Sequence, residues 1–179
     1  GKVQLPDHMV KPGIPAWAVY GDKDHRGNLI SSIQLSETDL EIFNNHIQAK
    51  YEAMKAEARA EAYMTDGADV LLVACNTPAR AAKGAVKNLR DMGIKAGLFR
   101  PITIWPFPIK QLQDLLPKVK HLVVVEANAG GQIEDELRLS LSHAGLKDAP
   151  PITHVRRAGG VLPQQTEIVD HVKSILEKK

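Results

Sequence analysis

The chain has 179 residues, of which 44% are hydrophobic and 25% are charged, and its formal net charge is +2. These values are ordinary for globular proteins, so they exclude a mainly disordered chain and a strongly basic nucleic-acid binder. The longest apolar runs are too short to cross a bilayer, and the start of the sequence has no signal-peptide pattern, so we expect a soluble, cytoplasmic protein. A single cysteine, Cys75, excludes a disulfide framework or a cysteine-ligated iron–sulfur cluster within these residues.

Residues 1–36 are rich in proline and glycine with polar residues between them, which is typical of an extended arm or linker. Residues 37–60 are rich in good helix formers, and Ser36 is placed to cap such a helix at its start. Apolar residues recur there at every third or fourth position and form one narrow stripe: Leu40, Phe43, Ile47, Tyr51 and Met54. We therefore expect a long amphipathic helix whose stripe needs a partner surface.

Residues 61–179 predict one α/β domain, because short apolar runs alternate with amphipathic stretches. Four strands are expected, at residues 70–75, 96–99, 122–126 and 152–156. Four helices are expected, at residues 78–92, 109–119, 132–144 and 163–176, with Gly93 and Gly145 ending two of them. Continuous apolar strands predict a mostly parallel sheet covered on both faces, which is a three-layer α/β/α sandwich. Asp66-Gly67 suits a tight hairpin, so we expect a short first strand to run antiparallel to the strand after it.

In a parallel sheet, ligands bind near the loops that follow the strands. Four such loops are expected, at residues 76–80, 100–108, 126–132 and 156–163. In the first, Thr77 is expected to cap the next helix, with Pro78 at its first position. The third and fourth contain glycines that could let backbone N–H groups approach a phosphate, but neither matches a dinucleotide fingerprint or a P-loop. Tight turns are the favoured interpretation of these glycines.

The loop at residues 100–108 is the most distinctive, because three prolines stiffen it and Trp105 and Phe107 stand on it. Two interpretations stay open. In one, Arg100 binds an anion or a partner's carboxylate and Trp105 anchors an interface. In the other, the two aromatic residues cover the end of the core and Arg100 pairs with an internal acid such as Glu126.

No self-sufficient catalytic group stands out in the sequence. The histidines are scattered, with no pair at ligand spacing on one helix, which argues against a zinc site. Cys75 is favoured as a small apolar filler over a nucleophile. Glu134, Asp135 and Glu136 lie near an expected helix start, where they favour the helix dipole and are expected to face solvent.

Several motifs resemble one family. The run Gly97-Leu-Phe-Arg-Pro-Ile-Thr-Ile-Trp-Pro-Phe-Pro108 resembles a signature of the 2-oxoacid:ferredoxin oxidoreductases, in the subunit that also carries their pyrimidine-binding thiamine domain. Val123-Val-Val-Glu-Ala-Asn-Ala-Gly130 with Gln132 is similar to the family's acidic-Asn-Gly-Gln turn, and Arg157-Ala-Gly-Gly160 is similar to its Arg-x-Gly-Gly segment. Segments at residues 17–21, 28–30, 48–52 and 68–73 are most similar to the 2-ketoisovalerate members. The resemblance covers essentially the whole chain.

The resemblance implies a fold like the C-terminal domain of transketolase, with a mixed five-stranded sheet whose first strand is antiparallel. It implies a parent enzyme that oxidatively decarboxylates a 2-oxoacid to acyl-CoA, with coenzyme A as co-substrate, and reduces ferredoxin. Thiamine diphosphate, magnesium and iron–sulfur clusters would lie in other domains or subunits, so we expect this fragment to bind no cofactor, to carry no catalytic residue and to be inactive alone. Its expected role is to pack against the other subunits and to support the active site; ketoisovalerate, oxoglutarate and pyruvate stay open as substrates.

The resemblance also marks candidate residues for an interface or an active-site edge: Arg100, Thr103, Trp105, Glu126, Asn128, Gly130, Gln132, Arg157, Gly159 and Gly160. The chain departs from the family pattern in three loops. Asn76-Thr77-Pro78 replaces a glycine-containing turn, Gly130-Gly131 has one glycine more than usual, and Arg156 stands where glycine is expected. The alternatives are a stand-alone phosphate- or CoA-binding module and a dimerisation domain; no nucleic-acid or membrane partner is expected.

Overall fold

The structure is a computed structural model that describes residue 4 and residues 13–29 and 33–177. The chain divides into two compact units, residues 1–50 and residues 51–179, which are described separately. The finer division into an arm at residues 1–36, a helix at residues 37–60 and a domain at residues 61–179 stays a prediction. No helix in the described residues combines the length and the apolar character that crossing a membrane requires.

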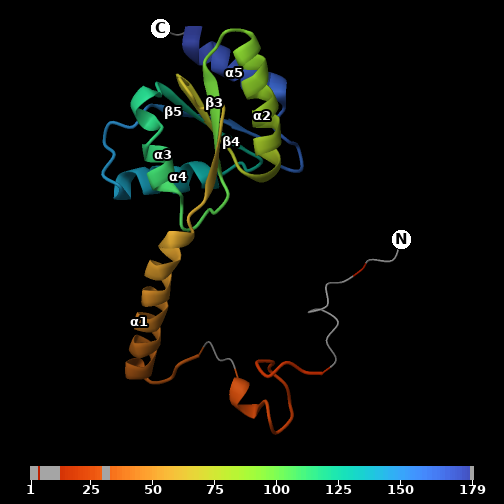
Figure 1. Ribbon diagram of the computed structural model, residues 1–179, viewed down its shortest axis with the longest axis vertical. Coiled ribbons are helices and arrows are strands. Elements are labelled where there is room, and N and C mark those ends of the chain that lie inside the picture. Colours follow the sequence, from red (N-terminus) through yellow and green to blue (C-terminus); the bar gives the residue numbers. More distant parts are fainter. Residues whose placement is uncertain (1–3, 5–12, 30–32, 178–179) are drawn as a thin grey trace. The chain divides into compact units, whose positions relative to one another are not determined.

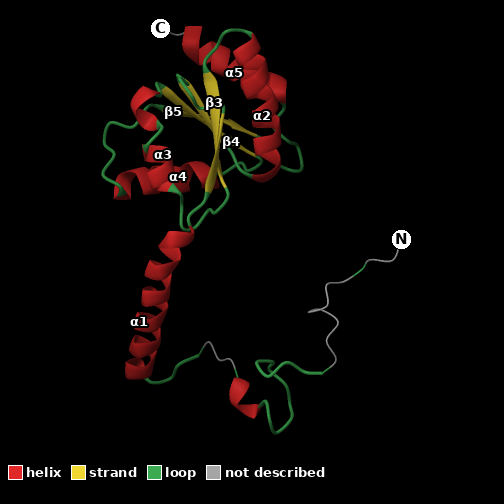
Figure 2. Cartoon of the chain, viewed as in Figure 1, coloured by secondary structure: helices red, strands yellow, loops and turns green. Residues whose placement is uncertain are grey.

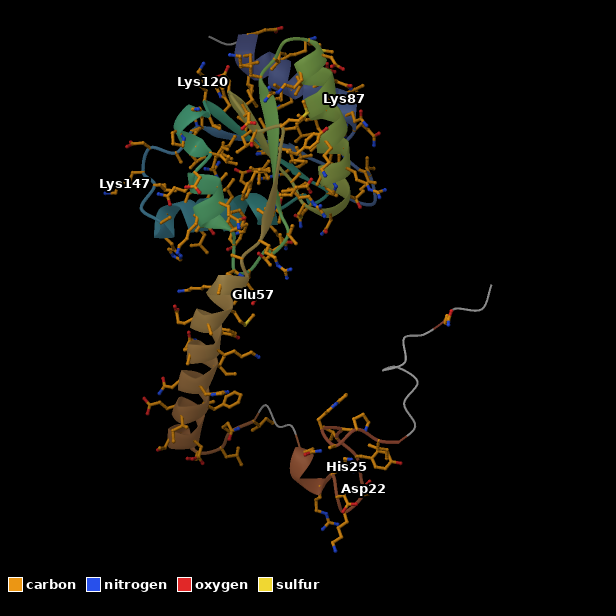
Figure 3. The ribbon with its side chains drawn as sticks, in the orientation of Figure 1. Asp22, His25, Glu57, Lys87, Lys120 and Lys147 are labelled. Carbon is orange, nitrogen blue, oxygen red and sulfur yellow. The ribbon has the colours of Figure 1, made fainter. Side chains whose placement is uncertain are left out.

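In the first unit, none of the described residues is buried. A short 3-10 turn, η2 (Arg26–Asn28), lies in a loop that the Asn28 side-chain amide holds by donating to the Ala16 and Ala18 carbonyls at 2.5 and 3.0 Å. The neighbouring His25 ring nitrogen Nδ1 lies 2.6 Å from the Asp22 carboxylate, and Figure 3 shows the two side chains together.

Helix α1 (Glu37–Met54) begins as the sequence predicts, because the Asp39 N–H donates to the Ser36 hydroxyl at 3.3 Å. It ends earlier than residue 60, since the turn η3 (Lys55–Glu57) and an extended Ala58 follow it. The helix stops there because the residues from Ala60 on form strand β1 in the sheet. Pairing with the neighbouring strand outweighs the good helix propensity of this alanine-rich segment.

The second unit contains a five-stranded mixed sheet with the order β1-β3-β2-β4-β5. Its strands are β1 (Ala60–Tyr63), β2 (Val70–Val73), β3 (Ala96–Pro101), β4 (His121–Glu126) and β5 (Ile152–Arg156). β1 runs antiparallel to β3 and all other neighbours are parallel (Figures 1 and 2). The predicted mixed sheet with an antiparallel first strand is therefore confirmed.

The expected hairpin between the first two strands is wrong. β1 pairs with β3, so that Ala60 faces Pro101 and Tyr63 faces Leu98. The turn itself is present, since the Ala68 N–H donates to the Thr65 carbonyl at 3.1 Å. β2 has no free side for β1, because β3 and β4 both pair with it through parallel ladders.

Helices cover both faces of the sheet and confirm the three-layer sandwich. Figure 1 shows α2 (Asn76–Asp91) and α5 (Gln165–Glu177) together on one side, with α3 (Ile109–Gln113), the turn η4 (Leu116–Lys118) and α4 (Gln132–His143) on the other. β2 divides its side chains between these layers: Val70 and Leu72 pack toward α2 and α5, whereas Leu71 and Val73 pack toward α3 and α4. All four are fully buried, and burial of such a side chain contributes about 1.5–3 kcal/mol.

Two glycines end helices as predicted. After α2, Gly93 has a positive φ of 82°, and the Ile94 N–H reaches back to the Leu89 carbonyl at 2.9 Å. After α4, Gly145 has a φ of 70°, and the Leu146 N–H reaches back to Leu141 at 3.0 Å. Both ends are Schellman motifs, which need a left-handed residue that glycine supplies without strain.

The predicted Thr77 cap of α2 is wrong. The helix begins at Asn76, with Cys75 as its N-cap and no side-chain hydrogen bond at that cap. Asn76 has a φ of +50°, a left-handed conformation that asparagine tolerates better than most residues. This is the turn in which the family resemblance leads one to expect glycine, the residue that adopts such a conformation freely.

Candidate functional site

Five segments meet at the carboxyl edge of the parallel strands. Four are the loops after β2, β3, β4 and β5. The fifth is the segment 55–59, because antiparallel β1 starts at Ala60, opposite Pro101 at the end of β3. Figure 3 shows Glu57 at one end of the second unit and Lys120, which precedes β4, at the other. The sequence predicted the four loops but not the fifth segment.

Arg100 forms an ion pair inside the chain, but its partner is Glu61 and not the predicted Glu126. Its Nη1 donates to Glu61 Oε2 at 2.9 Å, while Lys83 Nζ donates to Glu61 Oε1 at 2.5 Å. These hydrogen bonds, first from Lys83 and then from Arg100, lower the pKa of Glu61 despite its partial burial. Arg100 is about one-third exposed, so its other donors are available to a further group.

Thr103 ties the loop after β3 to the segment that precedes β1. Its hydroxyl oxygen accepts the Arg59 N–H at 2.9 Å, and the hydroxyl donates to the Pro106 carbonyl at 3.0 Å. The Arg59 carbonyl in turn accepts the N–H groups of Ile102 and Thr103 at 2.9 and 3.2 Å. Thr103 therefore fixes where the chain enters the sheet.

The two aromatic residues of this loop have different roles. Phe107 is buried and packs against Phe99, with ring centroids 6.4 Å apart, so it covers the end of the core as one interpretation predicted. Trp105 is 50% exposed and meets the Tyr51 ring edge-on at 5.1 Å. Ile102 and Ile104 on the same loop are also exposed, which leaves an apolar surface around Trp105.

The third loop satisfies its own backbone donors. The buried Glu126 carboxylate accepts the Ile133 N–H at the start of α4, and Asn128 Oδ1 accepts the Gly130 and Gly131 N–H groups at 2.7 and 3.2 Å. Burial raises the pKa of Glu126, opposed by the Ile133 hydrogen bond and the Arg156 charge. A phosphate at this helix start would have to displace a carboxylate, so the geometry disfavours the phosphate interpretation here.

Glu134 is buried at the start of α4, contrary to the expectation from the sequence. It was expected to face solvent with Asp135 and Glu136, but it is only 5% exposed, whereas Asp135 is exposed. Arg138 donates to its carboxylate from Nε and Nη2 at 2.9 and 2.6 Å, and Arg156 donates to its other oxygen. Burial acts to raise the pKa of Glu134, but the hydrogen bonds from Arg138 and Arg156 outweigh burial and lower it.

Arg156 connects two of the three departures from the family pattern. Its guanidinium lies directly against Gly131, where any Cβ would collide with it and where φ is +76°. Its Nε is 3.8 Å from Glu126 Oε2, and these two buried atoms have no hydrogen-bond partner. The additional glycine thus provides the space that the arginine occupies, and the arginine supplies positive charge to Glu126 and Glu134.

The fourth loop also satisfies its own groups. Arg157 pairs with Glu167, and the same carboxylate accepts the Gln164 N–H at 2.9 Å at the start of α5. Gly159 and Gly160 have positive φ values of 64° and 88°, which shows that they serve the turn. A carboxylate therefore already lies at the second glycine-containing helix start.

The candidate residues fall into separate groups. Arg100 lies near the end of β3, and Thr103 and Trp105 lie on the loop after it. Glu126 ends β4, Asn128 and Gly130 lie on the loop after it, and Gln132 begins α4. The loop after β5 carries Arg157, Gly159 and Gly160. Burial and then the Glu126 charge raise the pKa of the Cys75 thiol, while the Arg100 charge opposes them. No cluster of three histidine, cysteine or acidic side chains suited to a metal occurs among the described residues.

Solved structures support the fold. A 2-oxoglutarate:ferredoxin oxidoreductase from Magnetococcus marinus, with 2-oxoglutarate, coenzyme A and succinyl-CoA bound, matches 79% of this chain and 24% of its own chain, with a TM-score of 0.63 and 21% identity. A split-gene transketolase, described as an inactive β4 tetramer, matches 66% of this chain and 41% of its own, with a TM-score of 0.55 and 22% identity. The expected transketolase-like architecture is therefore confirmed.

Sequence relatives are closer. The ketoisovalerate oxidoreductase subunit VorB of Methanothermobacter marburgensis is 36% identical over 161 residues, which cover 89% of this chain and 44% of that protein. The 2-oxoglutarate synthase subunit KorA of Methanocaldococcus jannaschii is 37% identical over 101 residues, which cover 56% of this chain and 25% of that protein. The chain spans less than half the length of these relatives. Residues 68–168 match the family described as pyruvate:ferredoxin oxidoreductase core domain II. The family expected from the sequence motifs is confirmed, and the chain belongs to the pyruvate:ferredoxin oxidoreductase core domain II family.

Proposed function

We propose that this chain is one domain of a cytoplasmic 2-oxoacid:ferredoxin oxidoreductase that acts on 2-ketoisovalerate. The whole enzyme would decarboxylate the 2-oxoacid oxidatively, transfer the acyl group to coenzyme A and reduce ferredoxin. The observation that carries the proposal is the family match over residues 68–168, together with the VorB similarity over 89% of the chain.

Within that enzyme, the proposed role of this domain is to pack against other subunits or domains and to support one edge of the active site. The carboxyl edge supports this role, because Glu126, Asn128 and Glu167 already satisfy backbone donors that a diphosphate would use. Thiamine diphosphate, magnesium and iron–sulfur clusters are assigned to other parts of the enzyme. Arg100 and Trp105 are the proposed contact residues, since both keep exposed surface, Arg100 near the end of β3 and Trp105 on the loop that Thr103 fixes.

The test is to purify the tagged chain from its native host under anaerobic conditions, together with whatever assembles with it. We expect a complex that contains thiamine diphosphate and reduces ferredoxin in the presence of 2-ketoisovalerate and coenzyme A. The rates of ferredoxin reduction with 2-ketoisovalerate, 2-oxoglutarate and pyruvate at equal concentration are then compared, and the 2-oxoacid with the highest rate is taken as the substrate. The isolated chain is expected neither to bind thiamine diphosphate nor to turn over 2-oxoacids, and measurable thiamine binding by it would contradict the proposal.

The proposed edge role is tested by Arg100→Ala in that complex, with Lys87→Ala as the matched control. Lys87 is an exposed cation on α2, and Figure 3 shows it on the outer layer. Arg100→Ala is expected to lower turnover with unchanged subunit composition, whereas Lys87→Ala changes neither. Full activity of the Arg100→Ala complex would contradict a contact role for this residue.

A stand-alone phosphate- or CoA-binding module is the alternative, and the occupied helix starts disfavour it. Calorimetry of the isolated chain with coenzyme A and with nucleotides separates the two proposals. We expect no stoichiometric heat signal, because a bound phosphate would face the Glu126 and Glu167 carboxylates.

A further inference from the structure

A groove of about 830 Å³ lies beside the signature loop in the second unit. It is lined by residues of η3, of the loop after β3, of α3 and of α4. Its lining includes the buried Phe107 and the partly buried Ile109, and Trp105 and Leu139 in its walls are each 50% exposed. An exposed apolar surface that gathers several large side chains marks an interaction site more often than scattered single residues do. We call this feature the α4 groove.

The charge around the α4 groove is mainly basic. Lys55 and Lys110 line it, and Lys110 takes part in no ion pair of the described residues. Lys55 pairs only with Glu52, and both side chains are more than half exposed, so this pair contributes little stability. The acidic residue of the groove, Glu136, already accepts a hydrogen bond from Ser140 at 3.4 Å. A partner with an apolar face and acidic flanks would therefore complement the groove.

Helix α1 has that chemistry. It is 18 residues long, none of its residues is buried, and its apolar stripe includes Leu40 and Phe43, each about 40% exposed. Only Tyr51, near the end of the stripe, has a described ring contact, with Trp105 of the same chain. The helix carries four acidic side chains and one basic side chain, Lys50. An isolated helix of this length is marginal in water, so its stripe needs a surface to pack on.

Charge decides which surface that is. Two α1 helices packed on each other would bring two acidic helices together, and like charges destabilise such a pair. The lysines of the α4 groove remove that repulsion, and a helix laid in an apolar groove is a common mode of recognition. We propose that α1 of a second copy of this chain docks in the α4 groove, so that two copies exchange helices across a two-fold axis. This inference deepens the proposed packing role and rests on it.

Cross-linking between different variants tests the contact. In a Cys75→Ala background, one variant carries Ile47→Cys in the middle of the α1 stripe and the other carries Leu139→Cys in the groove. Mixing them under mild oxidation is expected to give a disulfide-linked dimer, and replacing the second variant by Lys87→Cys on the exposed face of α2 is expected to give none. Efficient cross-linking of the Ile47→Cys variant with itself would overturn the proposal, because it would place α1 against α1.

Sedimentation tests the charge argument. The unmodified chain is expected to dimerise at tens of micromolar, and Lys110→Glu is expected to weaken the dimer about tenfold. Adding Glu41→Lys to that variant is expected to restore part of the affinity, because the helix then carries a new positive charge and the groove a new negative charge. A folded chain that stays monomeric, or a dimer that is insensitive to Lys110→Glu, would overturn the proposal. Turnover by the complex is measured separately: a monomeric chain in an active complex refutes only the helix exchange, and a dimeric chain without an active complex refutes only the enzyme assignment.

Discussion

Replacing Arg156 by methionine removes the cation that Glu126 and Glu134 share. Methionine keeps most of the length and the apolar stem, so the change tests charge more than packing. The Arg156 side chain is 23% exposed, while those of Glu126 and Glu134 are 2% and 7% exposed. Leaving a buried charge without its partner costs about 3–5 kcal/mol. We expect Arg156→Met to lower the free energy of unfolding by about 3 kcal/mol at pH 7, near the lower end of this range. The reason is that Arg156 is partly solvated and that Glu134 keeps its hydrogen bonds from Arg138.

The effect should depend on pH in a defined direction. In the native chain the pKa of Glu134 is lowered, so its contribution to stability is present above its ordinary pKa of 4.5 and is lost as pH falls through the lowered value. The pKa of Glu126 is raised by burial, so its contribution has the opposite sign and is lost as pH rises through the raised value. Without Arg156 both carboxyl groups favour the neutral form more strongly, so the difference between variant and native chain should shrink toward pH 4.

The assay is urea unfolding followed by circular dichroism at pH 7 and at pH 4, with the slope against urea compared between variants. Arg157→Met is the control, because the Arg157–Glu167 pair is partly exposed and should contribute at most about 1 kcal/mol. The reasoning would be refuted if Arg156→Met lowered the free energy of unfolding by less than about 1 kcal/mol at pH 7, or by the same amount at both pH values.

Three further substitutions test other parts of the carboxyl edge. Gly131→Ala is expected to cost more than about 1–2 kcal/mol in thermal or urea unfolding, because it combines a left-handed backbone with a collision against Arg156; a neutral effect would contradict it. Thr103→Val should cost about 1 kcal/mol in the same assay and increase proteolysis near Arg59, since it removes the hydroxyl that accepts the Arg59 N–H; unchanged cleavage would count against the anchor. Glu61→Gln should lower the free energy of unfolding by less than about 1 kcal/mol at pH 7 and not at all well below pH 4, because the native contribution of a carboxyl with a lowered pKa vanishes as pH falls. A loss that does not change with pH would argue against an ionic origin.

The features that could be predicted from the sequence are those that neighbouring residues determine. Continuous apolar runs such as residues 70–73 identified the parallel strands, because a strand covered on both faces must be apolar throughout. Gly93 and Gly145 identified two helix ends, since the required left-handed backbone is a local property. The alternation of strands and helices identified the four loops of the carboxyl edge, because the loops after parallel strands lie at the same edge of the sheet.

The features that were missed depend on contacts between distant segments. Glu61 lies 39 residues from Arg100, and nothing in either neighbourhood selects this pair over Glu126. The burial of Glu134 had one local signal, Arg138 four residues later, but the other cation comes from β5, 22 residues away. β1 pairs with β3 because both sides of β2 are already taken, which is a property of the complete sheet.

The antiparallel direction of β1 has a consequence for anything attached to this domain through Arg59. A parallel first strand would start at the opposite edge of the sheet, whereas β1 starts beside Pro101 and is held there by Thr103. A polypeptide joined at this point is therefore tethered to the same edge as the four loops, and a short tether creates a millimolar effective concentration there. A contact with these loops whose dissociation constant lies below that concentration would then be formed most of the time, so the direction of one short strand determines which contacts of the attached segment are favoured.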